Sequence, residues 1–109
     1  MDPRARYDQL ADDLAAQHDD VELGQMMGMP AIKRAGKMVC GFSKDEGAMV
    51  FKLPDEAVRA RATALDGAHL FDPSGGRRAP MKEWVVVSAA YVDLWPDLAN
   101  QALSTPPAG

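Results

Sequence analysis

The alternation of apolar and polar residues is clearest between residues 23 and 53 and predicts three β-strands joined by two tight turns. The apolar runs 37–42 and 48–52 follow Gly36 and Gly47, and glycine takes the positive φ of a hairpin turn at little cost. We therefore expect a meander of antiparallel strands at the centre of the fold.

The same alternation predicts which side chains share a face. Met38, Cys40 and Phe42 are expected on one face of their strand, and Met49 and Phe51 on one face of the next. Cysteine occurs once, so no internal disulfide can form, and its place in an apolar strand predicts a buried small side chain.

The first of the three predicted strands is irregular. Gly28 and Pro30 interrupt it, and proline cannot donate a hydrogen bond within a sheet. We therefore expect an edge strand, or a bulge near Met29.

Apolar residues at helical spacing predict helices before and after the strands. The first helix covers about residues 3–17, the second runs from about 54 to 67, and the third follows Ser88. Pro96 either kinks the third helix or begins its second half, because proline lacks an N–H and crowds the preceding turn. Short strands are expected at 70–71 and 81–88.

Together these elements predict an α+β fold with a single antiparallel sheet and helices packed on it, in the order α-β-β-β-α-β-β-α. Residues 1–104 are expected to form one domain, with a loop at 72–80 and a disordered tail at 105–109. The 109 residues, 47% hydrophobic and 26% charged, are typical of one globular domain.

No apolar run is long enough to span a membrane or resembles a signal peptide, so a cytoplasmic protein is expected.

The net charge of −4 is unevenly distributed along the chain. Residues 1–22 hold seven acids and two arginines, whereas residues 23–87 hold ten bases and seven acids. Six basic residues fall on two predicted loops: Lys33, Arg34, Lys37, Arg77, Arg78 and Lys82. If these loops lie on one side of the sheet, the six charges form a nucleic-acid-binding surface with steep salt dependence. Ordinary surface charge is the alternative, since no aromatic residue is interleaved for base stacking.

The sequence offers no pattern of residues for catalysis or for a cofactor. His18 and His69 are 51 positions apart, and neither has a second ligand at metal-binding spacing. His69, Asp72 and Ser74 lack the glycine-flanked turn of a nucleophile, and the loop at 75–78 lacks the spacing of a phosphate-binding loop. We therefore expect a non-enzymatic protein without a metal or cofactor.

Several methionines gather in the predicted meander and suggest an interaction surface. Methionine fills cores, forms adaptable contacts and can bind copper(I), but the regular spacing of a copper site is missing. With only three helices, one face of the sheet is expected to be incompletely covered. The predicted interface residues are Met26, Met38, Met49 and Trp84. The partner would be an unidentified protein or a second copy of the chain.

Four short segments and a tryptophan resemble the N-terminal domain of the TfoX/Sxy proteins, and more loosely the MmcQ/YjbR-like proteins. The matching residues are 25–30, 36–38, 47–54, 81–85 and Trp95. The resemblance covers about residues 5–103 and implies a compact α+β domain with one antiparallel sheet. TfoX/Sxy proteins are linked to regulation of competence genes, and YjbR-like proteins are often labelled DNA-binding. The present sequence ends after its last predicted helix, where full-length TfoX-type proteins continue into a C-terminal domain.

Two functional hypotheses follow from the sequence. The first is a protein-interaction module that uses the sheet face and its methionines. The second is a nucleic-acid-binding regulator that uses the six basic residues.

Overall fold

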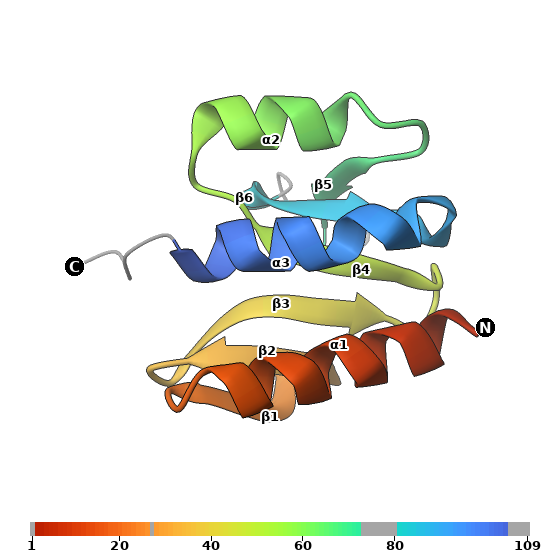
Figure 1. Cartoon of the computed structure of the whole chain (residues 1–109). Coiled ribbons are helices and arrows are strands. Elements are labelled where there is room, and N and C mark those ends of the chain that lie inside the picture. Colours follow the sequence, from red (N-terminus) through yellow and green to blue (C-terminus); the bar gives the residue numbers. More distant parts are fainter. Residues whose placement is uncertain (1, 27, 73–80, 105–109) are drawn as a thin grey trace.

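The computed structural model describes residues 2–26, 28–72 and 81–104. Its elements in chain order are α1 (Pro3–Gln17), β1 (Val21–Met26), β2 (Met29–Arg34), β3 (Lys37–Ser43), β4 (Ala48–Lys52), α2 (Glu56–Thr63), β5 (His69–Phe71), β6 (Met81–Val87), the 3-10 helix η1 (Ala89–Leu94) and α3 (Trp95–Ser104) (Figure 1). The loop and tail residues 73–80 and 105–109 lie outside the described part of the chain.

The described strands form one six-stranded antiparallel sheet in the order β1-β2-β3-β4-β6-β5. The three α-helices all lie on one face of this sheet, α1 over β1 to β3 and α3 over its middle (Figure 1). The predicted α+β fold with one antiparallel sheet and helices packed on it is therefore confirmed. None of the helices within the described ranges has the length and apolar character needed to cross a bilayer.

The irregular first strand proves to be two strands, so four strands precede α2 where the sequence predicted three. Met26 pairs with Met29, and Gly28 has a φ of 76°, so this segment turns back on itself in a hairpin. The glycine signal is the same one that located the turns at Gly36 and Gly47, both of which have positive φ. Pro30 was expected to mark an edge strand, but it lies in the inner strand β2, and the edge strand β1 contains no proline.

Pro30 lies in β2, between β1 and β3. The β2–β3 ladder ends at the pair Ala31 and Gly41, and Ala31 directly follows Pro30, whose missing N–H leaves nothing to donate to β3. The register irregularity lies between Ile32 and Lys33, not near Met29 as expected.

This irregularity decides which face each residue of β3 occupies. Ile32 pairs with Cys40 and Lys33 with Met38, so β3 carries one extra residue, Val39, as in a β-bulge. Met38 and Cys40 consequently point to opposite faces, and the prediction that they share a face is wrong.

The helix-covered face holds most of the core. The largest fully buried side chains on it are Trp95, Phe51, Ile32, Met49 and Leu53. Tyr7 of α1 packs against Phe42 of β3 with ring centroids 5.6 Å apart. Cys40 is fully buried, as predicted, and its burial raises the pKa of the thiol.

The second helix was predicted over about 54–67 and is shorter in the structure, where α2 begins at Glu56. Asp55 caps α2 by accepting a hydrogen bond from the Val58 N–H at 3.1 Å, and α2 ends at Thr63, before Gly67. Pro96 is the second residue of α3 and follows the 3-10 helix η1, so it begins the second half of the last helical segment.

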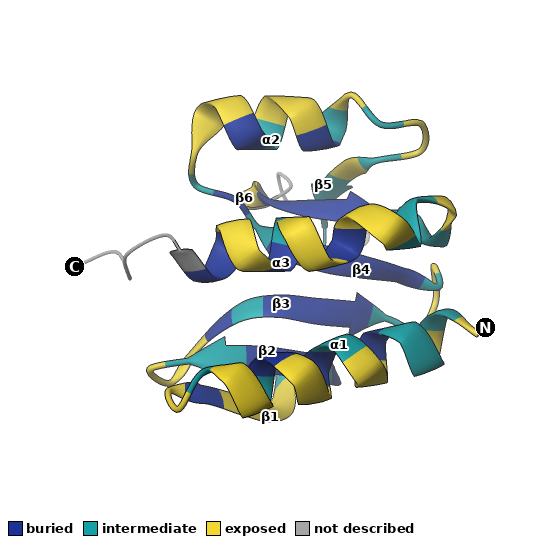
Figure 2. Ribbon diagram, viewed as in Figure 1, coloured by how far each residue is buried: buried dark blue, intermediate teal, exposed yellow. Residues whose placement is uncertain are grey.

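The opposite face of the sheet has no helix over it within the described residues. It nevertheless carries a second cluster of buried residues: Met29, Ala31, Met38, Ala48, Val50, Trp84 and Val86. The strands that supply this cluster are buried along most of their length (Figure 2). We call this side the helix-free face.

Candidate binding surface on the helix-free face

Two lysines stand in the middle strands on the helix-free face. Lys33 follows Ala31 on β2, and Lys52 follows Val50 on β4, so strand alternation places both on the side of the buried Ala31 and Val50. Lys33 pairs with Met38 and Lys52 with Trp84. Since β3 separates β2 from β4, the backbones of the two lysines lie about 10 Å apart.

Neither lysine has a counter-ion within the described part of the chain. Both side chains are half-buried, and neither Lys33 nor Lys52 makes a hydrogen bond or an ion pair there. The Lys33 Nζ lies over Gly24, 3.4 Å from the position a Cβ would take, so the missing side chain of Gly24 leaves room for the ammonium group. An anionic group could therefore pair with these ammonium groups without displacing an internal partner.

Side chains lying flat on the sheet form an apolar floor beside the lysines. A Cβ at Gly41 would overlap the Met38 Cε and would lie 3.0 Å from the Met29 Cε, so both thioether chains extend across this glycine. Met38 is 4% exposed and Trp84 is 8% exposed, although no described helix covers them. The two methionine side chains thus cover the sheet at Gly41, where no described helix does.

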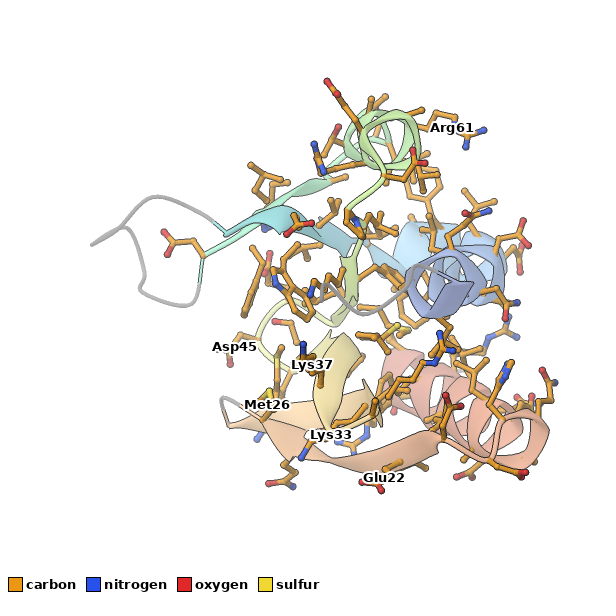
Figure 3. The ribbon with its side chains drawn as sticks, turned by 90° about the vertical axis from the view of Figure 1, so that its left-hand side faces the viewer. Glu22, Met26, Lys33, Lys37, Asp45 and Arg61 are labelled. Atoms are coloured by element: carbon orange, nitrogen blue, oxygen red, sulfur yellow. The ribbon has the colours of Figure 1, made fainter. Side chains whose placement is uncertain are left out.

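Charge is unevenly divided between the two faces. All five lysines of the chain, Lys33, Lys37, Lys44, Lys52 and Lys82, belong to strands or to their turns. The three α-helices carry no lysine, their four arginines are outnumbered by five acids, and α1 exposes Asp8, Asp12 and Asp13 to solvent. Lys33 and Lys37 lie on the sheet, away from the helices (Figure 3). An acidic partner is therefore attracted more strongly to the sheet than to the helical layer.

Arg34 was predicted to be part of the nucleic-acid-binding surface, but the structure places it on the other side of the sheet. Its Nε donates to the Asp20 Oδ2 at 2.7 Å and its Nη1 donates to the carbonyl of Leu103 at the end of α3. The hydrogen bond from Arg34 holds the pKa of Asp20 below its usual value. Arg34 therefore points to the helix side, where it ties β2 to α3, and does not belong to the basic surface.

Of the other predicted basic residues, the structure describes some and not others. Lys37 is exposed at the first position of β3. Lys82 occupies β6, and Arg77 and Arg78 lie outside the described residues. Since β3 and β6 both run antiparallel to β4, they begin at the same end of the sheet. Lys37 and the start of β6 therefore share this end.

The predicted interface residues separate between the two faces. Met26 is half-buried beside Met29 on the helix-free face, where Met38 and Trp84 also lie. Met49 is 0% exposed on the other face, where it pairs with Phe42 and Val87 under the helices. Met49 is therefore a core residue, and its assignment to an interface is corrected.

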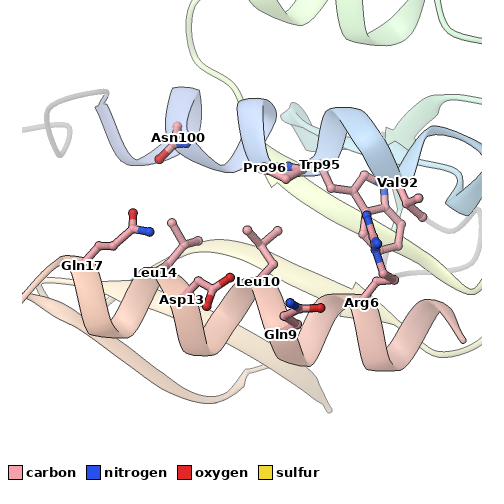
Figure 4. Close-up of a pocket in the computed structure, with 10 residues that line it drawn as sticks. All are labelled: Arg6, Gln9, Leu10, Asp13, Leu14, Gln17, Val92, Trp95, Pro96 and Asn100. Atoms are coloured by element: carbon pink, nitrogen blue, oxygen red, sulfur yellow. The ribbon is translucent and has the colours of Figure 1, made fainter. Parts of the chain in front are cut away.

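A groove of about 230 Å³ runs between α1 and α3 on the opposite side of the molecule (Figure 4). Arg6, Gln9 and Asp13 line it from α1, and Trp95 and Asn100 from α3. The Trp95 Nε1 is buried without a hydrogen-bond partner among the described residues. Charges of both signs line the groove, which gives it no preference for an anion or a cation.

The histidines and acids do not assemble a metal site in the described ranges. His69 Nε2 lies 2.9 Å from Glu46 Oε1 in an exposed pair that links β5 to the β3–β4 turn. Ser74, the third member of the nucleophile pattern considered above, lies outside the described residues.

Comparison of the chain with protein-family models, with curated proteins and with solved structures finds no match. The resemblance to the TfoX/Sxy N-terminal domain therefore stays a prediction based on the residues quoted for it.

Proposed function

We propose that this chain is a non-catalytic binding domain that docks an acidic segment of a protein partner on its helix-free face. One observation carries the proposal: Lys33 and Lys52 are half-buried on this face and have no counter-ion within the described residues. A half-buried ammonium group gains more from pairing with a carboxylate than one that water surrounds completely.

The spacing of the two lysines supports a peptide partner. Met38 and Trp84 pair with the two lysines across the strands and are nearly buried, so the lysine side chains, not the apolar ones, offer the contact. An extended segment with carboxylates about 10 Å apart complements this spacing. The acidic α1 favours approach of such a segment from the sheet side.

Nucleic acid is the second candidate, and the shared end of β3 and β6 favours it. Phosphates approaching that end of the sheet would meet Lys33 and Lys37 first. Two features weigh against it: the net charge of −4, and the burial of Trp84, which leaves its ring unavailable for base stacking.

Fluorescence anisotropy of a labelled glutamate-rich peptide distinguishes the two candidates when a labelled DNA duplex is titrated in parallel. The double variant Lys33→Glu, Lys52→Glu is expected to weaken peptide binding about tenfold or more, because two charged contacts are reversed. Lys44→Glu is the matched control, since Lys44 lies in the β3–β4 turn at the other end of the sheet.

Equal peptide affinity for the double variant and the wild type contradicts the proposal. Tight, salt-sensitive binding of the duplex that the double variant loses, with no binding of the peptide, selects the nucleic-acid candidate instead.

A further inference from the structure

Strand β1 is an open edge of the sheet. Among the described strands it pairs with β2 alone, and its six residues make it twice as long as the three-residue strand β5 at the other edge. An edge strand exposes unpaired N–H and C=O groups that can pair with another strand. No proline interrupts β1.

The backbone groups that β1 exposes follow from its register. Antiparallel residues alternate in the direction of their hydrogen bonds, and the Ala35 N–H donates to the Asp20 carbonyl on the β2 side. Glu22, Gly24 and Met26 therefore bond to β2, and the groups of Leu23 and Gln25 point outward. The outward N–H of Val21 already donates to the His18 carbonyl at 3.2 Å. The outward C=O of Val21 is therefore the group that remains to accept a hydrogen bond from a second strand.

The side chains along this edge are complementary to those of the same edge in a second copy of the chain. Leu23 is 45% exposed, the more exposed of the two large hydrophobic residues that stand out at the surface within the described ranges. On the helix-free side, Gly24 offers no side chain, and the Lys33 ammonium lies above it. Glu22, two positions from Gly24, points to the same side and pairs in register with Lys33.

We propose that β1 pairs antiparallel with β1 of a second copy of this chain, with Leu23 opposite Leu23. In this register Glu22 of each copy lies opposite Gly24 of the other, where the carboxylate meets the ammonium of Lys33. The two Leu23 side chains meet on the helix side, and Gln25 donates to the free carbonyl of Val21.

The neighbouring symmetric registers are less favourable. A shift in one direction places Glu22 opposite Glu22, which sets like charges against each other. A shift in the other direction places Leu23 opposite Gln25 and leaves Val21 without a partner. The proposed register alone pairs opposite charges and joins the two exposed leucines, and the resulting two-fold interface closes on itself as a dimer.

This pairing differs from the interface predicted from the methionines, because it uses a sheet edge and leaves the helix-free faces open. A two-fold axis perpendicular to the sheet joins the two sheets into one and turns both helix-free faces to the same side. The dimer therefore pairs Lys33 of each copy with Glu22 of the other and presents the two Lys52 side chains on the same side, so an acidic segment that docks at Lys33 competes with the dimer.

Sedimentation equilibrium of the full chain, over a wide range of concentration, tests the dimer. The wild type is expected to reach twice the monomer mass of 11.8 kDa. Leu23→Pro is expected to abolish the dimer, because it removes an outward N–H that the monomer does not use and leaves the β1–β2 ladder intact. Leu23→Ala keeps that N–H and is expected to weaken the dimer without abolishing it.

Charge variants test the register even if the proline variant fails to fold, a failure that circular dichroism would reveal. Glu22→Lys is expected to weaken the dimer roughly fivefold, and adding Lys33→Glu restores it, because the cross-strand pairs are reversed together. Lys52→Glu, two strands further into the sheet, leaves it unchanged. A wild type that stays monomeric overturns the proposal, as does a dimer that a folded Leu23→Pro variant retains.

Discussion

On the helix-covered face, Phe51 and Met49 are buried by a second layer, whereas on the helix-free face Met38 and Trp84 reach nearly the same burial with no described helix above them. The first face is closed by elements that come from distant parts of the sequence. On the second, the side chains of Met38 and Met29 lie across Gly41. This difference teaches that low exposure alone does not identify the rigid core.

The difference also separates stability from binding. Side chains under the helices have neighbours on all sides and cannot relax when one is removed. Met38 and Met29 lie over Gly41 and can move without shifting a helix. We therefore expect substitutions on the helix-covered face to change stability, and those on the helix-free face to change binding.

The largest expected effect compares two methionines of opposite faces. Met49→Ala is expected to lower the free energy of unfolding by about 4 kcal/mol, near the upper end for such truncations, because the helices above it hold the cavity open. Met38→Ala is expected to cost about 2 kcal/mol, because Met29 can move into the space. Urea denaturation of both variants measures the difference, and equal losses would mean that the two faces are equally rigid.

A substitution at Gly41 sharpens the comparison. Gly41→Ala is expected to cost about 1 kcal/mol, because the new Cβ overlaps the Met38 Cε, which has to move aside, and lies 3.2 Å from the Pro30 carbonyl oxygen. In the Met38→Ala background the same substitution is expected to cost much less, since the overlapping group is gone. The coupling comes from a double-mutant cycle of unfolding free energies, and additive costs would show that Met38 does not lie over Gly41.

Much of the fold follows from local sequence signals. The turns at Gly36 and Gly47, the cap at Asp55 and the role of Pro96 were predictable because each depends on residues within one turn of chain. The extra hairpin at Gly28 carried the same glycine signal. The sequence does not distinguish this hairpin from an irregular single strand, because Pro30, two residues after Gly28, fits either one.

The site was less predictable because it depends on pairing between strands. The bulge at Val39 moves Met38 to the face opposite Cys40, and alternation within β3 alone cannot reveal it. The partners of Arg34 lie 14 residues before it and 69 residues after it. The residues next to Arg34 in the sequence therefore suggest a basic cluster, whereas in the fold Arg34 connects β2 to α3. Lys52 was not selected from the sequence, since its relation to Lys33 appears only once β3 separates their strands.

The third prediction concerns that tether on the helix-covered face. Arg34→Ala is expected to cost about 1 to 2 kcal/mol, because the carbonyl of Leu103 loses a charged donor. Arg34 lowers the pKa of Asp20 from 3.8, so the pair stabilises the fold above that pH and the contribution is lost as the pH falls through the lowered pKa.

Thermal unfolding of the wild type and Arg34→Ala at several pH values tests both statements. The difference in stability is expected to be largest near neutral pH and smaller in acid. A difference that grows on acidification contradicts the role given to Asp20.

The smallest expected effect on stability belongs to the two lysines of the helix-free face. Lys33→Gln and Lys52→Gln keep most of the side-chain length, and neither lysine has an ion-pair partner in the described ranges. Each substitution is therefore expected to change the free energy of unfolding by no more than about 0.5 kcal/mol. A larger loss, measured by urea denaturation, would mean that the lysines stabilise the sheet. If stability is unchanged while binding of the acidic peptide is lost, the lysines serve the ligand, and the helix-free face is a binding surface that the fold itself does not require.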